Sequence, residues 1–381
     1  PLVLDRFIEF NYETGEYVAH VIKEWKLSED AKTLDITMQD NITFHNGAKA
    51  TIDDVLYSLL RYSKVELANL TDKNIYGNID YDKSEKTGDY SARLVLKEPS
   101  VSMIGGFTTG YLLCKEHIES AGEDNAWWDN VVGSGPYKVE SIVQGDRYNL
   151  VKNPSYWGEL KAQFDKVVIR FYPEASTMYM DYETGALDIA VNPLAVDVSR
   201  VINGEVDNTI VDIYPMLFLA YLAFNEEKNP ALADPNVRKA IILSIDQEIV
   251  SKIAFDFMAT PTTALMHNGM GGRTEWGIKR DVDAAKAALA ESGYKPGDIK
   301  LVLGTSTNNV NLAVAEAIQA QLLEVGFAVE ITATDPATNL NNLRNAGPDT
   351  YDITQGFVQY ITLDQNALIM AMSKANGSTF F

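Results

Sequence analysis

Apolar and polar residues alternate in short segments over the first half of the chain. Residues 33–38 (TLDITM) alternate with a period of two, which predicts a half-buried strand. Residues 137–152 repeat this alternation on both sides of a Gln-Gly-Asp turn, which predicts a β-hairpin. Residues 51–54 (TIDD) have the form of a capping box, so we expect a helix to begin there. The first 132 residues are therefore predicted to form a small, partly β region.

From residue 235 onward the chain is predicted to be helical and then to alternate strands with helices. Pro235 suits the first position of a helix, and the apolar spacing of residues 235–255 predicts one long helix. The later elements follow the order strand 299–303, helix 311–325, strand 327–333, helix 336–346 and strand 351–357. This alternation predicts a parallel sheet with helices on its faces.

The predicted parallel sheet indicates where a ligand would bind. In open parallel sheets, ligands bind beyond the carboxyl ends of the strands. These ends lead into the loops 304–309 (GTSTNN), 334–335 (TD) and 358–360 (VQY). Their polar side chains suit hydrogen bonding to an uncharged or zwitterionic ligand, although ordinary solvated loops have a similar composition.

Composition and charge exclude several classes of partner. The 381 residues include 53 acidic and 32 basic ones, and the formal net charge of -21 disfavours nucleic acids and anionic membranes.

The length predicts two or three domains. The apolar run 214–224 is shorter than the ~20 residues that a membrane helix needs, and it predicts a buried strand instead. Cys114 has no second cysteine for a disulfide or a zinc motif.

No motif for catalysis or for a bound cofactor is present in the sequence. The four histidines are far apart, so no metal site is expected, and no nucleotide-binding or nucleophile motif occurs. Carboxylate pairs such as Asp53 and Asp54 leave a hydrolase as a remote alternative. Residues 133–136 (GSGP) look like a phosphate cradle, but they lead into a predicted strand and not into a helix. We therefore expect a turn there, no cofactor and no enzymatic activity.

Several segments, taken in order, resemble a known family. They are Glu24-Trp25 with SEDAKTLDITMQDNITFHNGAKATIDDVLYSLLR, then GSGPYKV with NPSYWG, GALDIAV, AFNEEKNPALADPNVRKAIILSIDQEIV, ATPTTALM and DVDAAKAALAESGY. The ordered set resembles the extracytoplasmic solute-binding proteins of peptide- and nickel-type ABC importers, known as binding-protein family 5. The likeness covers almost the whole chain.

This resemblance implies an α/β, two-lobed periplasmic-binding-protein fold of type II, similar to cluster C, with an extra small α+β domain on the first lobe. We expect the extra domain at 1–132, the rest of lobe I at 133–260 and lobe II at 261–381, with a hinge near 259–262. Relatives extend further in both directions, which indicates a cropped or naturally short chain.

The resemblance also implies a function and partners. Such a receptor captures a small solute in the cleft between its lobes by hinge closure and delivers it to the permease subunits of an ABC transporter. The expected protein is a monomer outside the cytoplasm, in the periplasm or lipid-anchored on the cell surface. Residues 1–10 (PLVLDRFIEF) lack the features of a signal segment.

Two departures from the family pattern affect the expected ligand. Peptide-binding relatives carry GW-x-A-D where this chain has 356–360 (GFVQY), so Tyr360 replaces the Asp that pairs with a peptide amine. Dipeptide-type relatives hold the carboxylate with an Arg in the loop that here reads GTSTNN, where Thr305 stands nearest. Oligopeptide remains the leading class, and an uncharged ligand such as an oligosaccharide is the alternative. The expected ligand-binding residues are Thr305, Asn308, Asn309, Phe357, Gln359, Tyr360, Trp276 and Tyr221.

Overall fold

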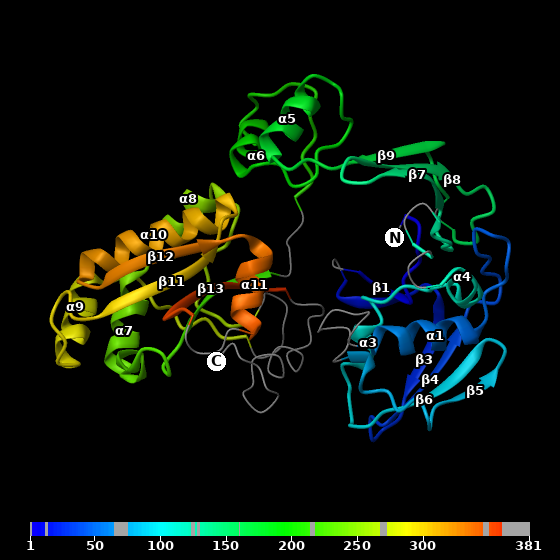
Figure 1. Cartoon of the computed structure of the whole chain (residues 1–381), viewed down its shortest axis with the longest axis horizontal. Helices are drawn as coiled ribbons and strands as arrows, with labels where there is room; N and C mark the ends of the chain where they lie inside the picture. The colour runs from blue at the N-terminus through cyan, green and yellow to red at the C-terminus, as the bar shows by residue number, and fades with distance from the viewer. Residues whose placement is uncertain are drawn as a thin grey trace. The chain divides into compact units, whose positions relative to one another are not determined.

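The chain divides into two compact units, Pro1–Pro173 and Glu174–Phe381, in a computed structural model (Figure 1). The structure describes residues 2–11, 14–64, 75–122, 126–127, 130–159, 161–213, 218–266, 273–345 and 350–359. The domain boundaries expected after residues 132 and 260 stay predictions. Within the described ranges, no helix is both long enough and apolar enough to pass through a bilayer.

An antiparallel sheet forms the centre of the first unit. Its strands follow the order β3 (Ile22–Leu27), β4 (Thr33–Met38), β6 (Ser91–Val95) and β5 (Glu85–Gly88). The strand predicted at 33–38 is confirmed, because alternate side chains of β4 are buried. Helix α1 (Ile52–Tyr62) begins at the predicted capping box and contributes Val55 and Leu59 to the same core.

The other strands of the first unit form two smaller sheets. The predicted hairpin is confirmed as β7 (Tyr137–Val143) and β8 (Arg147–Lys152), and β9 (Lys166–Arg170) pairs with β8. Strands β1 (Ile8–Asn11) and β2 (Glu16–Ala19) pair with each other. Two short helices complete the unit, α3 (Met103–Gly106) and α4 (Lys115–Ala121).

The GSGP segment lies against the start of the chain and bends at Gly135 and Pro136, without a hydrogen-bonded turn. A Cβ on Gly133 would lie 1.9 Å from the carbonyl oxygen of Val3, so only glycine fits there. His45 bridges this segment, because its Nδ1 accepts from the Gly133 amide at 3.3 Å and its Nε2 lies 3.0 Å from the Gly135 carbonyl oxygen. These contacts require a neutral imidazole with the proton on Nε2. The glycines therefore serve chain packing.

Asp5 joins the start of the chain to the NPSYWG segment. Its buried carboxylate lies 3.1 Å from His20 Nε2 and accepts from the Tyr156 hydroxyl at 3.1 Å and from Trp157 Nε1 at 2.8 Å. Burial opposes ionisation, but the hydrogen bonds from His20 and Trp157 outweigh it, and the pKa of Asp5 lies below its ordinary value. Asp5 thus ties three distant segments together.

A mixed four-stranded sheet forms the centre of the second unit. Its order is β10 (Phe218–Phe224), β13 (Ile353–Gln359), β11 (Lys300–Ser306) and β12 (Ala328–Thr334). Strand β11 runs parallel to both neighbours, and β10 is antiparallel to β13. The predicted parallel arrangement of the three later strands is confirmed. Strand β10 is an edge strand and is only partly buried, so the prediction of a buried strand was wrong in that respect.

Helices cover both faces of this sheet (Figure 1). Helix α10 (Asn309–Val325) packs on the face that carries Leu301 and Leu303, while α11 (Pro336–Asn345) contacts β11 and β12. The remaining helical elements of the unit are α5 (Ala175–Glu183), α6 (Ala195–Ile202), η2 (Pro230–Ala233), α7 (Pro235–Ser244), α8 (Gln247–Phe255) and α9 (Val282–Glu291).

The single helix predicted at 235–255 was wrong, because the structure has two. Ile245 is extended, and the Asp246 side chain caps α8 by accepting from the amides of Glu248 and Ile249. The Asp246 amide donates to Gln321 Oε1 on α10. A cap and a distant partner therefore interrupt the helix although the apolar periodicity continues.

We expect Asp5→Asn to lower the free energy of unfolding of the first unit by about 2 kcal/mol, because the neutral amide replaces the buried carboxylate whose charge strengthens the hydrogen bonds from Tyr156 and Trp157. Urea unfolding followed by Trp fluorescence measures this, since four of the five Trp residues belong to residues 1–173. Asp35→Asn is the control, because that carboxylate pairs with Arg93 at the surface. Equal losses from both changes would contradict the role of Asp5.

Acidification should destabilise the first unit through His45. Burial lowers the pKa of His45, so the unfolded chain takes up a proton at His45 before the folded one does. The stabilisation that neutral His45 contributes is present above the ordinary pKa of histidine, about 6.5. It is lost as the pH falls below that value. His45→Gln should be less stable at pH 7.5 and should lose part of the pH slope between pH 7.5 and 5.5. An unchanged slope in urea unfolding would rule this mechanism out.

Candidate functional site

The carboxyl ends of β11, β12 and β13 bring the predicted ligand loops of the second unit to one edge. Ser306 is the partner of Thr334 in the parallel ladder, so β11 and β12 end side by side. The amide of Thr307 donates to the Thr334 carbonyl oxygen at 2.8 Å, which joins the two loops. Strand β13 lies on the other side of β11 and runs in the same direction. The edge predicted from the sequence therefore exists, and its role in binding stays a prediction.

Thr305 is buried at this edge and bonds across the sheet. Only 1% of Thr305 is exposed, and its hydroxyl donates to Gln355 Oε1 at 3.0 Å. The same hydroxyl lies 3.3 Å from the Asn311 carbonyl oxygen in the first turn of α10. Thr305 therefore links β11, β13 and α10. Gln355 was not among the predicted site residues, because its partner lies 50 positions away in sequence.

Asn308 and Asn309 are exposed at the start of α10. The Asn308 side chain caps the helix by accepting from the amides of Val310 and Asn311, at 3.0 and 3.5 Å. Asn311 Nδ2 donates to the Ser306 hydroxyl at 2.6 Å. Asn309 follows the cap as the first residue of the helix. The loop is thus fixed by its own hydrogen bonds and presents amide groups to solvent.

Two tyrosine rings lie over glycines near the ends of the strands. A Cβ on Gly356 would come within 2.4 Å of the Tyr221 ring, and one on Gly304 within 2.3 Å of the Tyr351 ring. Tyr221 and Gly356 are partners in the β10–β13 ladder. Burial raises the pKa of Tyr221, so this hydroxyl remains protonated at neutral pH. Phe357 is half buried on β13.

The structure does not bring Trp276 to this edge by any described contact. Its indole is 67% exposed, and its amide donates to Thr263 Oγ1 at 2.9 Å. Glu275 accepts from the Thr262 hydroxyl and the Thr263 amide, which lowers the pKa of Glu275 to about 2. Tyr360 lies outside the described residues, and of Gln359 only the main chain is described.

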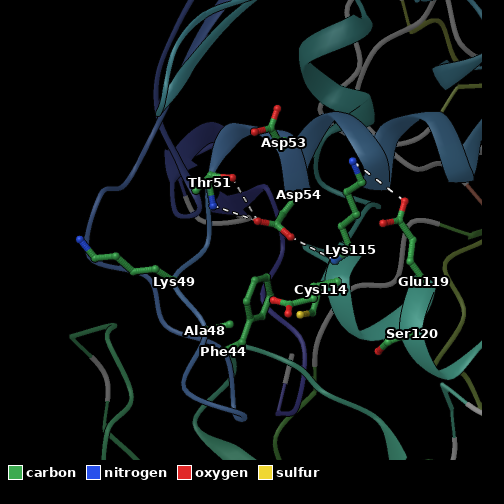
Figure 2. A pocket seen from close by; sticks show the side chains of 11 residues that line it. Phe44, Ala48, Lys49, Thr51, Asp53, Asp54, Cys114, Lys115, Glu119 and Ser120 are labelled. Atoms are coloured by element: carbon green, nitrogen blue, oxygen red, sulfur yellow. Dashed lines mark hydrogen bonds and ion pairs between the residues drawn. The ribbon is translucent and has the colours of Figure 1, made fainter.

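A separate polar pocket of about 610 Å³ lies in the first unit, between the loop before α1 and the start of α4 (Figure 2). Asp54 lines it and accepts from the Thr51 amide at 2.9 Å and from the Lys115 amide at 3.0 Å. Burial raises the pKa of Asp54 although these donors oppose the shift. Cys114 is buried beside it. The sequence did not indicate this pocket, because its walls lie about 60 residues apart.

Asp53 and Asp54, and one member of each of the acidic pairs Glu226/Glu227 and Asp281/Asp283, have structural partners. Asp54 holds the starts of α1 and α4, while Asp53 pairs with Lys86 at 2.8 Å. Glu226 pairs with Arg238 at 2.7 Å, and Asp281 caps α9 through the Ala284 amide. Within the described side chains, no group of three or more His, Cys, Asp or Glu residues is arranged to hold a metal ion.

The comparisons with known proteins agree with this architecture. The sequence model of the bacterial extracellular solute-binding proteins, family 5, matches residues 16–379. The Escherichia coli K12 dipeptide-binding protein is 24% identical over 359 residues, which cover 86% of this chain and 65% of that protein. The glutathione-binding protein GsiB of Salmonella paratyphi A is 24% identical over 342 residues, covering 89% of this chain and 65% of that one. This chain therefore spans just under two thirds of the length of these curated relatives.

Solved structures show the same fold. A dipeptide-binding protein from Pseudoalteromonas sp. SM9913, in complex with Met-Leu, has a TM-score of 0.83 at 20% identity, covering 100% of this chain and 79% of that one. A putative peptide-binding protein AppA from Clostridium difficile has a TM-score of 0.85 at 20% identity, covering 99% and 78%. The expected two-lobed α/β fold of type II is confirmed. Because the family match extends over most of the chain, the protein belongs to family 5 of the bacterial extracellular solute-binding proteins.

Proposed function

We propose that this protein is the solute-binding receptor of an ABC importer, with oligopeptide as the leading ligand class. The observation that carries the proposal is the family match over residues 16–379, together with a polar edge at the carboxyl ends of β11, β12 and β13. The parallel strands place main-chain and side-chain hydrogen-bonding groups at that edge. Thr305, Asn308, Asn309, Tyr221, Phe357, Gln359, Tyr360 and Trp276 remain the proposed ligand-binding residues.

The relatives support a small polar solute and leave its identity open. They include proteins named for dipeptides and for glutathione. Solved neighbours hold the peptide STSA, agropinic acid, mannopinic acid or Ni(L-His). For this chain we favour a peptide over a metal complex, because the described residues hold no cluster of metal ligands.

The proposed mechanism is binding without chemistry. Closure of the two units on the solute would be driven by contacts that exist only in the closed state. The hydrogen bonds that fix Thr305 and Asn308 reduce the entropy lost when a ligand binds at the strand ends. The carboxylates considered for hydrolysis are used as caps and ion pairs, so no catalytic role is proposed for them.

The remaining parts of the proposal concern the cell. The receptor would act outside the cytoplasm, in the periplasm or lipid-anchored on the cell surface. It would be a monomer that delivers its solute to membrane permease subunits. The net charge of -21 makes nucleic acid an unsuitable partner.

A second candidate ligand class is an uncharged solute such as an oligosaccharide. The loop 304–309 carries no charged residue, and Thr305 stands nearest to where an Arg would pair with a carboxylate. Amide and hydroxyl groups suit a sugar or a capped peptide as well as they suit peptide main chain.

Calorimetry against dipeptides, tripeptides, neutral oligosaccharides and Ni²⁺ tests the receptor function. We expect one class to bind, and at 100 times its dissociation constant it should stabilise the protein by about 2.7 kcal/mol. The solute should be recovered unchanged after prolonged incubation. Catalytic conversion of the solute would contradict the proposal.

With the solute so identified, Asn309→Ala should weaken binding about fivefold, because one exposed amide is removed from the proposed site. The melting temperature of the free protein should not change. Gln144→Ala removes an exposed amide from the β7–β8 turn of the first unit and serves as the control. An effect of Gln144→Ala as large as that of Asn309→Ala would count against the proposed edge.

A further inference from the structure

Three buried polar atoms without a hydrogen-bond partner belong to the elements around the proposed ligand edge. They are Gln355 Nε2 on β13, level with Thr305 near the end of β11, Thr334 Oγ1 at the end of β12 and Asn339 Oδ1 on α11. The described side chains hold eight such atoms, and three of them are on these elements. Folded proteins leave few buried polar groups unpaired, and each exception requires an explanation. A polar group of a solute is one explanation for the unpaired amide of Gln355, which lies beside Thr305.

Gln355 is the most constrained of the three residues. It is 4% exposed, and its amide oxygen accepts from the Thr305 hydroxyl at 3.0 Å. That hydroxyl has one hydrogen but two acceptors within reach, since the Asn311 carbonyl oxygen lies 3.3 Å away. The orientation of the Gln355 amide therefore decides which acceptor the hydroxyl serves.

The hydrogen bonds around Thr305 can run in either direction. When Gln355 Oε1 accepts from Thr305, the amide nitrogen of Gln355 has no hydrogen-bond partner and can donate to a solute. When the amide is rotated by half a turn, Gln355 Nε2 donates to Thr305, and the Thr305 hydroxyl donates to the Asn311 carbonyl oxygen. The amide oxygen of Gln355 is then without a hydrogen-bond partner and can accept from a solute. Gln355 can thus present a donor or an acceptor, but never a charge.

The two chain segments that meet at Gln355 and Thr305 are also uncharged. No charged residue occurs in 301–311 or in 353–359. Asp335 follows β12, and its carboxylate already accepts from the amides of Ala337 and Thr338 at 3.1 and 3.0 Å. A charged solute terminus bound at Gln355 itself would lose its hydration without gaining a counter-charge from either of the two segments 301–311 and 353–359.

We infer that Gln355, held by Thr305, is a specificity-determining residue that binds an uncharged amide or hydroxyl group of the solute. The edge selects such a group over a free ammonium or carboxylate terminus. This inference rests on the proposed receptor function. Because only 4% of Gln355 is exposed, the proposal requires its side chain to become accessible when the solute binds.

Calorimetry on the whole chain with three probes tests this selectivity. N-acetyl-dialanine amide and cellobiose are neutral, and dialanine carries two charged termini. At least one neutral probe should bind about tenfold more tightly than dialanine, and Gln355→Leu should weaken that binding about tenfold. Gln319→Leu is the matched control, because Gln319 Nε2 donates to the Val329 carbonyl oxygen within the fold. It should leave the affinity for the neutral probe unchanged.

Gln355→Glu provides a second variant of nearly the same shape. It should weaken binding of the neutral probe and strengthen binding of dialanine, whose ammonium group gains a counter-charge. If Gln355→Leu does not fold, the comparison of Gln355→Glu with wild type shows whether Gln355 sets the preference for a neutral probe. An unchanged preference in Gln355→Glu would overturn the inference.

Other outcomes distinguish the inference from the proposed function. The inference is overturned if neither neutral probe binds, or if a folded Gln355→Leu protein binds the neutral probe as wild type does. Binding of dialanine alone would overturn the inference and leave the receptor function in place. Turnover of any probe would instead contradict the receptor function, and the inference that depends on it.

Discussion

The parallel pairing of β11 on both sides determines where the second unit can place polar chemistry. The ladders to β12 and β13 occupy the main-chain groups of β11, and α10 and α11 pack against the sheet. Polar side chains inside such a layer would be buried without partners. They occur instead where the strand ends, at Thr305 and Ser306. The position of the proposed site is thus a consequence of how the sheet is built.

Local patterns predicted much of this architecture. The alternation in β4 and the strand–helix order after residue 299 are properties of neighbouring residues, so they could be found in the sequence. The loops at the strand ends could be located by the same reasoning. The break between α7 and α8 could not, because the apolar spacing continues through Ile245 while a cap at Asp246 and a partner on α10 end the helix.

The candidate site was less predictable than the fold, since its contacts join distant positions. Thr305 was identified from its place in a loop, but its bond to Gln355 spans 50 positions and leaves no local signal. Likewise, residues 133–136 and Trp157 marked the family, and the structure shows that they hold the start of the chain through Val3 and Asp5. The residues that reveal the family therefore differ from those that would set the ligand.

Asp54 is a shared part of two helix starts. One carboxylate oxygen accepts from the Thr51 amide before α1, and the other accepts from the Lys115 amide at the start of α4, 61 positions away (Figure 2). The starts of α1 and α4 thus share one carboxylate in the folded chain. The two helix starts are therefore energetically coupled, and substitutions there should have non-additive effects on stability in a double-mutant cycle. A non-local contact of this kind raises the contact order of the first unit and slows its folding.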